Sequence, residues 1–150
     1  EDFRHIQDIK LIKDMGMNFI RMSHYPHDQA LLDACDKYGI IVWKEIPIVD
    51  LIDTTKAFEQ NAINQLQEMI AQYSNHSSIV MWGFMNEILL GIDRYLTDPL
   101  LKKACFEKTP VLAKKLHTIC KQMDPDRLTT IAHHGDIELY EKWGMHTITD

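Results

Sequence analysis

Helical and strand-like segments alternate along the whole chain, and this alternation restricts the fold more than any other feature of the sequence. Continuous apolar runs predict four strands, at residues 18–23, 40–46, 79–85 and 128–134. Helical periodicity with capping residues predicts helices at 3–15, 28–39, 55–73, 109–123 and 136–144. A run that is apolar throughout is typical of a strand in a parallel sheet covered by helices. The sequence therefore predicts an α/β fold, with residues 88–108 as an irregular or partly helical insertion.

Two architectures share this alternation, the open doubly wound sheet and the (β/α)8 barrel. An open sheet that binds phosphate has a glycine-rich turn after its first strand, whereas the segment "SHYPHDQ" (23–29) contains no glycine. Barrel enzymes build their sites at the carboxyl ends of the strands. Polar residues gather at those ends here, namely Arg21, Ser23, His24, Glu45, Asn86, Glu87, His133 and His134. The pattern favours a partial TIM barrel with about four parallel strands and flanking helices, since a complete barrel has eight strands.

Composition excludes several classes of partner. A formal charge of −6 argues against nucleic acid or anionic lipid, and no apolar run approaches the roughly 20 residues of a membrane span. Cys35, Cys105 and Cys120 lie far apart without zinc-type spacing, so we interpret them as buried apolar residues. We expect no cofactor and no metal, and the sequence does not predict a compartment.

Two carboxylates follow predicted strands that are consecutive in the sequence. Glu45 and Glu87 would lie at the same end of a parallel sheet. Paired carboxylates there suggest acid/base catalysis on a glycosidic bond. Apolar neighbours such as Trp43 would raise the pKa of a carboxyl group by desolvation. The alternative is that each glutamate pairs with a basic residue at a strand end, for which Arg21 is available. The pattern alone leaves both interpretations open.

Amide and imidazole groups stand beside these carboxylates. Asn86 can hold a sugar hydroxyl through its donor and acceptor atoms, or it can be an ordinary turn residue. His24 either binds a sugar ring or caps the strand end. His133 and His134 could form a metal pair, but adjacent strand residues point to opposite faces, so we expect only one of them to line the pocket. That residue is His133.

Three stretches together resemble a known family. They are "IKLIKDMGMNFIRMSHYPHDQALLDACDKYGIIVWKEIP" (9–47), "NHSSIVMWGFMNE" (75–87) and "LHTICKQMDPDRLTTIA" (116–132). The match closely resembles the catalytic barrel of glycoside hydrolase family 2, which includes β-galactosidases, β-glucuronidases and β-mannosidases. The sequences of these stretches are most similar to those of β-galactosidase-type members. The resemblance implies a retaining exo-β-glycosidase that acts on terminal β-linked sugars.

The resemblance also implies roles for single residues. Glu87 takes the position of the general acid/base, and Asn86 that of the amide that binds the sugar 2-hydroxyl. His24 and Arg21 match pocket residues. Glu45 matches a supporting glutamate that is not the nucleophile, which replaces the pairing of Glu45 with Glu87 suggested by the pattern.

The resemblance implies that residues 1–150 form a single partial domain, truncated at both ends and carrying about strands two to five of the barrel. The nucleophile would lie outside these residues, so we expect the chain alone to be inactive. We expect it to self-associate or to pair with the missing half of the barrel, because its sheet edges would be exposed. Ser77 and Met85 depart from the usual family residues, and Met85 leaves the sugar identity open. The competing interpretation is a non-catalytic carbohydrate-binding or structural module with the same fold.

Overall fold

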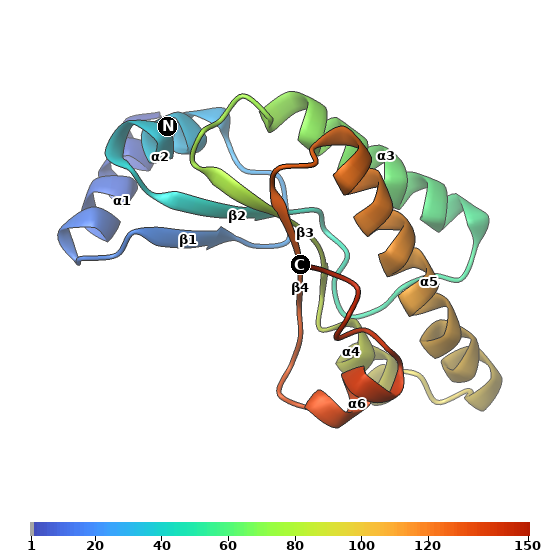
Figure 1. Cartoon of the computed structure of the whole chain (residues 1–150). Helices are drawn as coiled ribbons and strands as arrows, with labels where there is room; N and C mark the ends of the chain where they lie inside the picture. Colours follow the sequence, from blue (N-terminus) through green and yellow to red (C-terminus); the bar gives the residue numbers. More distant parts are fainter. Residues whose placement is uncertain (1) are drawn as a thin grey trace.

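A computed structural model describes residues 2–150 and places a single four-stranded sheet and six helices in that part of the chain (Figure 1). The elements are, in order, α1 (Asp2–Asp14), β1 (Phe19–Met22), α2 (Gln29–Tyr38), β2 (Ile41–Glu45), α3 (Lys56–Tyr73), β3 (Ile79–Asn86), α4 (Ile88–Tyr95), α5 (Pro99–Met123), β4 (Leu128–Ala132) and α6 (Ile137–Lys142). No helix within 2–150 combines the length and the apolar character that crossing a membrane requires.

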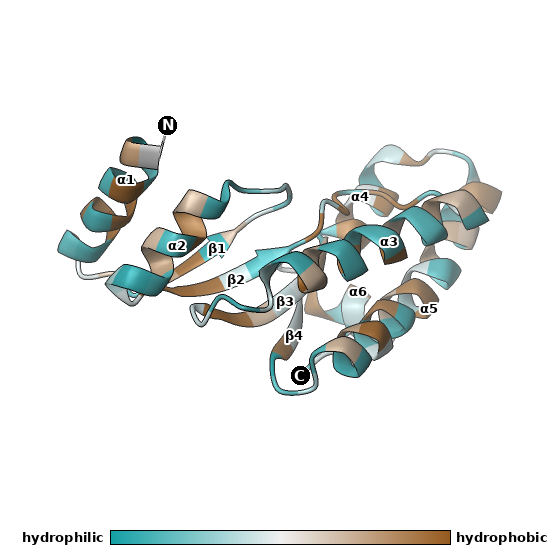
Figure 2. Cartoon of the chain, turned by 90° about the horizontal axis from the view of Figure 1, so that it is seen from above, coloured by the Kyte–Doolittle hydropathy of each residue, from teal (hydrophilic) through white to brown (hydrophobic). Residues whose placement is uncertain are grey.

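The strands lie side by side in the order in which they occur in the sequence. Each pair is parallel, and the order is β1-β2-β3-β4 without reversal. An open doubly wound sheet reverses its strand order at a switch point, whereas a barrel continues in one direction. Figure 1 shows the sheet curving, and α2, α3 and α5 lie along its outer side, with α1 beyond α2 (Figure 2). This arrangement confirms the predicted parallel α/β architecture.

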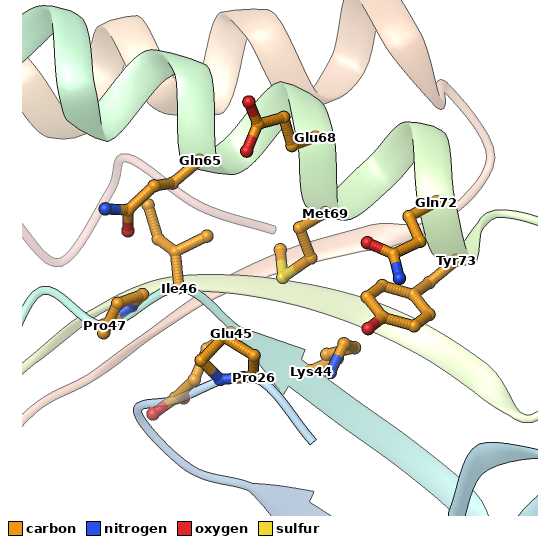
Figure 3. Close-up of a pocket in the computed structure, with 10 residues that line it drawn as sticks. All are labelled: Pro26, Lys44, Glu45, Ile46, Pro47, Gln65, Glu68, Met69, Gln72 and Tyr73. Carbon is orange, nitrogen blue, oxygen red and sulfur yellow. The ribbon is translucent and has the colours of Figure 1, made fainter. Parts of the chain in front are cut away.

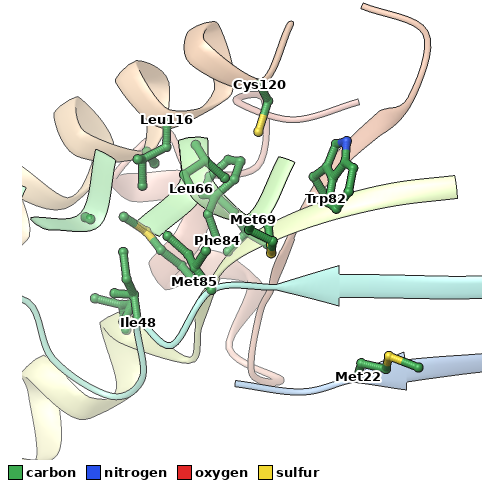
Figure 4. Packing of buried hydrophobic residues seen from close by; sticks show 14 of the residues in the cluster. Met22, Ile48, Leu66, Met69, Trp82, Phe84, Met85, Leu116 and Cys120 are labelled. Carbon is green, nitrogen blue, oxygen red and sulfur yellow. The ribbon is translucent and has the colours of Figure 1, made fainter. Parts of the chain in front are cut away.

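The main apolar core lies between the sheet and the outer helices (Figure 4). Trp82 and Phe84 of β3 are fully buried, and Leu66 of α3 and Leu116 of α5 are buried in the same cluster. All three cysteines are buried and free, as expected. Burial raises the pKa of the Cys120 thiol to about 12, which keeps the thiol protonated and poorly nucleophilic near neutral pH.

A polar clamp fixes the start of β3 to the segment that follows α5. The indole Nε1 of Trp82 donates to Asp124 Oδ2 at 3.0 Å, and Arg127 Nη1 donates to the same oxygen at 2.6 Å. Arg127 also donates to three backbone carbonyls, those of Ser74, His76 and Ile79. The clamp thereby sets the position from which β3 runs towards its carboxyl end.

The segment 88–108, expected to be irregular or partly helical, is mostly helical, and the helix start expected at 109 is wrong. These residues form α4 and the first part of α5, and the helix expected to start at 109 instead starts at Pro99. Asp98 caps it by accepting from the backbone N–H groups of Leu100 and Leu101. Asp98-Pro99 has the same cap-proline signature as Thr109-Pro110, and the helix uses the earlier one. Pro110 therefore lies inside α5, where the hydroxyl of Thr109 donates to the carbonyl of Cys105 at 2.8 Å.

Candidate active site

A charged network joins the carboxyl ends of three neighbouring strands. Arg21 of β1 donates from Nε and Nη2 to the two carboxylate oxygens of Glu45 on β2, at 3.0 and 2.9 Å. The same Nη2 donates to Asn86 Oδ1 on β3 at 2.7 Å. Glu45 is 3% exposed, so its charge is compensated by this fork of hydrogen bonds instead of by water.

His24 completes the coordination of the Glu45 carboxylate. Its backbone N–H donates to Glu45 Oε1 at 3.0 Å, and its ring Nδ1 lies 2.7 Å from the same oxygen. The residue has a φ of 55°, a left-handed conformation that turns the chain sharply after β1. Arg21 and His24 both bind the Glu45 carboxylate. Of the two interpretations of Glu45 that the sequence left open, the structure therefore supports pairing with a basic residue.

Trp43 packs against this network. The sequence did not indicate this role. The guanidinium of Arg21 lies 4.4 Å from the centroid of the Trp43 ring. On β3, Gly83 leaves the space that the indole occupies, because a Cβ there would stand 2.2 Å from Trp43 Nε1. The combination of an aromatic residue on one strand and a glycine on the next was the signal available in the sequence. The indole and Glu45 thus hold Arg21 from two sides.

Glu87 lies at the junction between β3 and α4, half-buried and in a left-handed conformation with φ 53° and ψ 27°. Its backbone N–H donates to the carbonyl of Ala132 on β4 at 2.9 Å. The register between β3 and β4 shifts between Gly83 and Asn86, which turns the end of the strand. Glu87 is therefore placed by the sheet itself, at the edge where parallel barrels have their active sites.

The segment after β2 holds the other side of the same junction. The N–H of Asn86 donates to the carbonyl of Ile48 at 2.9 Å, and the N–H of Asp50 donates to the carbonyl of Asn86 at 3.1 Å. Gly91 of α4 packs directly on Asp50, since a Cβ on Gly91 would lie 1.8 Å from the Asp50 carbonyl oxygen. Only glycine fits this contact, which fixes α4 and hence the direction in which Glu87 leaves the strand.

Tyr140 of α6 is a second residue that the sequence did not indicate. It is 1% exposed, and its ring stacks on His133 with the centroids 3.8 Å apart. The N–H of His134 donates to its hydroxyl at 3.4 Å. Burial raises the pKa of the Tyr140 hydroxyl, and the nearby Glu87 carboxylate raises it further. Tyr140 thus links α6 to the two histidines that follow β4.

The expectation that His133 and His134 point to opposite faces of a strand is wrong. It assumed a strand over 128–134, whereas β4 ends at Ala132, and both imidazoles lie against Tyr140. The structure therefore brings Arg21, Glu45, Asn86 and His24 into one network, while His133 lies with Tyr140.

Possible metal ligands occur elsewhere. Asp33, Asp36 and His76 offer ligand atoms within 4.8 Å of one another. Asp36 already accepts from the N–H of Ser78 at 2.7 Å and lies 2.7 Å from His76 Nδ1, contacts that tie α2 to the start of β3. We interpret the group as a structural contact at the amino end of β3, remote from the Glu87 end.

Comparison with known families decides the assignment. Residues 3–143 match the model of the glycosyl hydrolases family 2, TIM barrel domain. The chain belongs to glycoside hydrolase family 2. The four parallel strands are therefore part of the TIM barrel that characterises this family, which confirms the fold class expected from the sequence.

Several family 2 proteins are close in sequence and structure. A β-glucuronidase of Bacteroides fragilis is 35% identical over 140 residues, which are 88% of this chain and 18% of that protein. A Bacteroides uniformis β-glucuronidase 2, solved covalently bound to cyclophellitol-6-carboxylate aziridine, has a TM-score of 0.92 and 45% identity over the whole chain, or 18% of its own. A β-galacturonidase of Eisenbergiella tayi, solved with galacturonate, has a TM-score of 0.72 and 30% identity over 90% of this chain and 22% of its own.

The chain spans about a fifth of the length of these relatives. Membership of the family supports a glycosidase. The relatives named here are β-glucuronidases and a β-galacturonidase, so their names do not support the β-galactosidase-type substrate expected from the sequence.

Proposed function

We propose that this chain is part of a retaining exo-β-glycosidase that acts on β-linked uronides, with Glu87 as its general acid/base. The observation that carries the proposal is the position of Glu87, half-buried at the carboxyl end of β3 in a family 2 barrel and next to an amide held by Arg21. A half-buried carboxyl group at the mouth of a barrel is suited to proton transfer to a glycosidic oxygen. The nucleophile would come from a part of the protein outside these residues.

The network at the strand ends orients the groups that would bind the sugar. Asn86 Oδ1 accepts from Arg21, so the amide NH₂ remains free to donate to a sugar hydroxyl. His24 Nδ1 is hydrogen-bonded to Glu45 Oε1, which leaves Nε2 of the ring available to the substrate. Glu45 would act as a positioning residue, because both of its oxygens are already bonded to Arg21 and His24.

The proposed reaction has two steps. Glu87 gives its proton to the leaving oxygen while a second carboxylate attacks the anomeric carbon and forms a glycosyl-enzyme. Glu87 then takes a proton from the water that attacks the same carbon and releases the sugar. In retaining enzymes the two carboxyl groups lie about 5 to 5.5 Å apart, so the nucleophile would face Glu87 across the mouth. The covalent adduct of the Bacteroides uniformis relative supports a mechanism of this kind.

Substrate choice tests the uronide assignment. We expect the full-length protein to hydrolyse 4-nitrophenyl β-glucuronide or β-galacturonide with a kcat/KM at least about 100-fold above that for the β-galactoside, because a site built to pair a carboxylate rejects a neutral analogue strongly. Initial rates on the three substrates measure this. A preference for the β-galactoside would contradict the proposal, and absence of turnover with every glycoside would favour the non-catalytic module.

The free sheet edges support a second part of the proposal. β1 and β4 each have one edge without a strand partner within residues 2–150, and Phe19, Ile41 and Leu128 expose apolar side chains at the beginnings of their strands. We propose that the remaining strands of the barrel cover these edges. The 150-residue chain by itself is then expected to self-associate or to be marginally stable. Sedimentation of a stable monomer would contradict this expectation.

A further inference from the structure

A pocket on the outer side of the sheet lies between β2 and α3 (Figure 3). It has a volume of about 320 Å³, within the range of small-molecule sites. We call it the Lys44 pocket; its polar and charged lining residues are Lys44, Glu45, Gln65, Glu68, Gln72 and Tyr73, and Met69 is among its apolar ones. Successive strand residues point to opposite faces, so Lys44 points towards α3 while the carboxylate of Glu45 is bonded on the inner face. The pocket and the network at Arg21 thus share the residue Glu45, but its carboxylate belongs to the network.

Lys44 is an unusual residue for the inside of a sheet. It is 1% exposed, and its Nζ finds no hydrogen-bond partner anywhere in residues 2–150. The positive charge of Lys44 is stabilised by a cation–π contact with the ring of Tyr73, whose centroid lies 4.4 Å from Nζ. An aromatic face replaces only part of the hydration that a buried ammonium group loses. The ammonium group therefore keeps unused donors just beneath the surface of the pocket that Lys44 lines.

Two acidic residues line the pocket, Glu45, whose carboxylate is bonded to Arg21 and His24, and Glu68 at the rim. Glu68 of α3 lines the pocket but is exposed. The pKa of His27 is lowered mainly by burial of its imidazole and further by the charge of Lys44. Tyr73 connects the two basic residues, because its hydroxyl donates to the carbonyl of His27 at 3.4 Å. No acidic group in the described chain pairs with Lys44 at salt-bridge distance. The floor of the pocket is cationic without a counter-ion of its own.

We propose that the Lys44 pocket binds a small ligand carrying a single carboxylate, which pairs with the ammonium group of Lys44 when that side chain turns into the pocket. The carboxylate would accept the donors that the protein leaves unused, and the amides of Gln65 and Gln72 line the outer part of the pocket. Met69 and Tyr73 give apolar contact for a short carbon skeleton. Glu68 at the rim disfavours a doubly charged anion such as phosphate, which is why a monoanion fits better. The inference does not rest on the proposed glycosidase activity.

Calorimetric titration of the full-length protein with sodium acetate, against sodium chloride at equal ionic strength, tests the pocket. We expect saturable binding that Lys44→Met weakens by about tenfold or more, because a charge-assisted hydrogen bond is lost. The difference between wild type and Lys44→Met isolates this pocket from carboxylates bound elsewhere. Lys37→Met is the matched control, since Lys37 is exposed and its Nζ lies 5.6 Å from the ring centroid of Tyr38.

Proton exchange gives a second readout. Burial lowers the pKa of Lys44 to about 8, and a bound anion raises it again. Acetate binding near pH 8 should therefore take up protons, whereas binding near pH 6, where the amine is already charged, should not. Titrations in two buffers of different ionisation enthalpy measure this uptake.

Two further results bear on the assignment. Gln65→Trp, which narrows the pocket and keeps Lys44, should weaken acetate binding, while inorganic phosphate should bind wild type less tightly than acetate. Equal acetate affinity in wild type and Lys44→Met, or binding near pH 8 without proton uptake, would overturn the proposal. Phosphate binding as tight as acetate would overturn the choice of a single carboxylate.

Discussion

Glu87→Gln in the full-length protein should lower kcat/KM for uronides with poor leaving groups by about 10²- to 10⁴-fold, the usual contribution of a general acid/base. The substitution keeps the shape of the side chain and its place between β3 and α4 but removes the transferable proton. The left-handed backbone at this position is unchanged, because glutamine has the same backbone demands as glutamate. The loss should therefore appear in the chemistry and leave the fold intact.

A series of aryl β-uronides with increasingly acidic phenols separates acid catalysis from a general loss of binding. A phenol that leaves without protonation does not need the acid, so the variant should lose least with the best leaving group. Azide, a nucleophile that needs no base, should restore breakdown of the glycosyl-enzyme in the variant. Glu107→Gln, an exposed glutamate of α5, serves as the control. An equal loss for every leaving group, with no effect of azide, would contradict the role of Glu87.

Glu45→Gln is expected to have the largest effect on stability. The side chain of Glu45 is 1% exposed and that of Arg21 is 29% exposed, and removing one partner of a buried pair leaves the other charge uncompensated. The cost in the free energy of unfolding should be about 3 kcal/mol or more. Glutamine keeps only one acceptor oxygen, so Arg21 would lose one of its two hydrogen bonds to this side chain and be aimed less firmly at Asn86; kcat/KM should therefore fall in the same variant.

Thermal unfolding of the full-length protein measures this effect, and Glu59→Gln provides the matched control. Glu59 also bonds to a cation, Lys115, but both side chains are well exposed. Exposed pairs contribute little, so this control should leave Tm unchanged. Similar melting temperatures for Glu45→Gln and wild type would show that Glu45 is not the centre of the network.

Much of the fold could be predicted because local signals and tertiary packing agree. Asp28 caps α2 and Gly39 ends it in a left-handed conformation, as the sequence indicated. The helix start expected at 109 was wrong because two cap-proline pairs compete, since Asp98-Pro99 and Thr109-Pro110 look alike until packing selects one. A proline inside a helix is costly in isolation, but here the buried face of α5 outweighs it.

The candidate site was predictable where residues end strands and unpredictable where it depends on contacts distant in sequence. The pairing of Arg21 with Glu45 was one of the two interpretations open from the sequence, because both residues lie at strand ends. The packing of Trp43 over Gly83 and of Tyr140 on His133 depends on neighbours in space. The shortened β4, which moves His133 and His134 onto Tyr140, reflects a strand boundary, the least certain feature of any sequence-based assignment.

The strand order has a consequence for how this segment is made. Because β1, β2, β3 and β4 pair in the order of synthesis, each strand meets a finished neighbour as it leaves the ribosome and need not wait for residues still to be translated. One helix joins β1 to β2 and β2 to β3, and two helices join β3 to β4, so no pairing requires residues beyond the next strand and pairing can advance from the amino end. The acid at Glu87 would be set in place only when β4 arrives, since its N–H bonds to Ala132. Within this segment, Glu87 therefore reaches its final position after β1, β2 and β3 have paired.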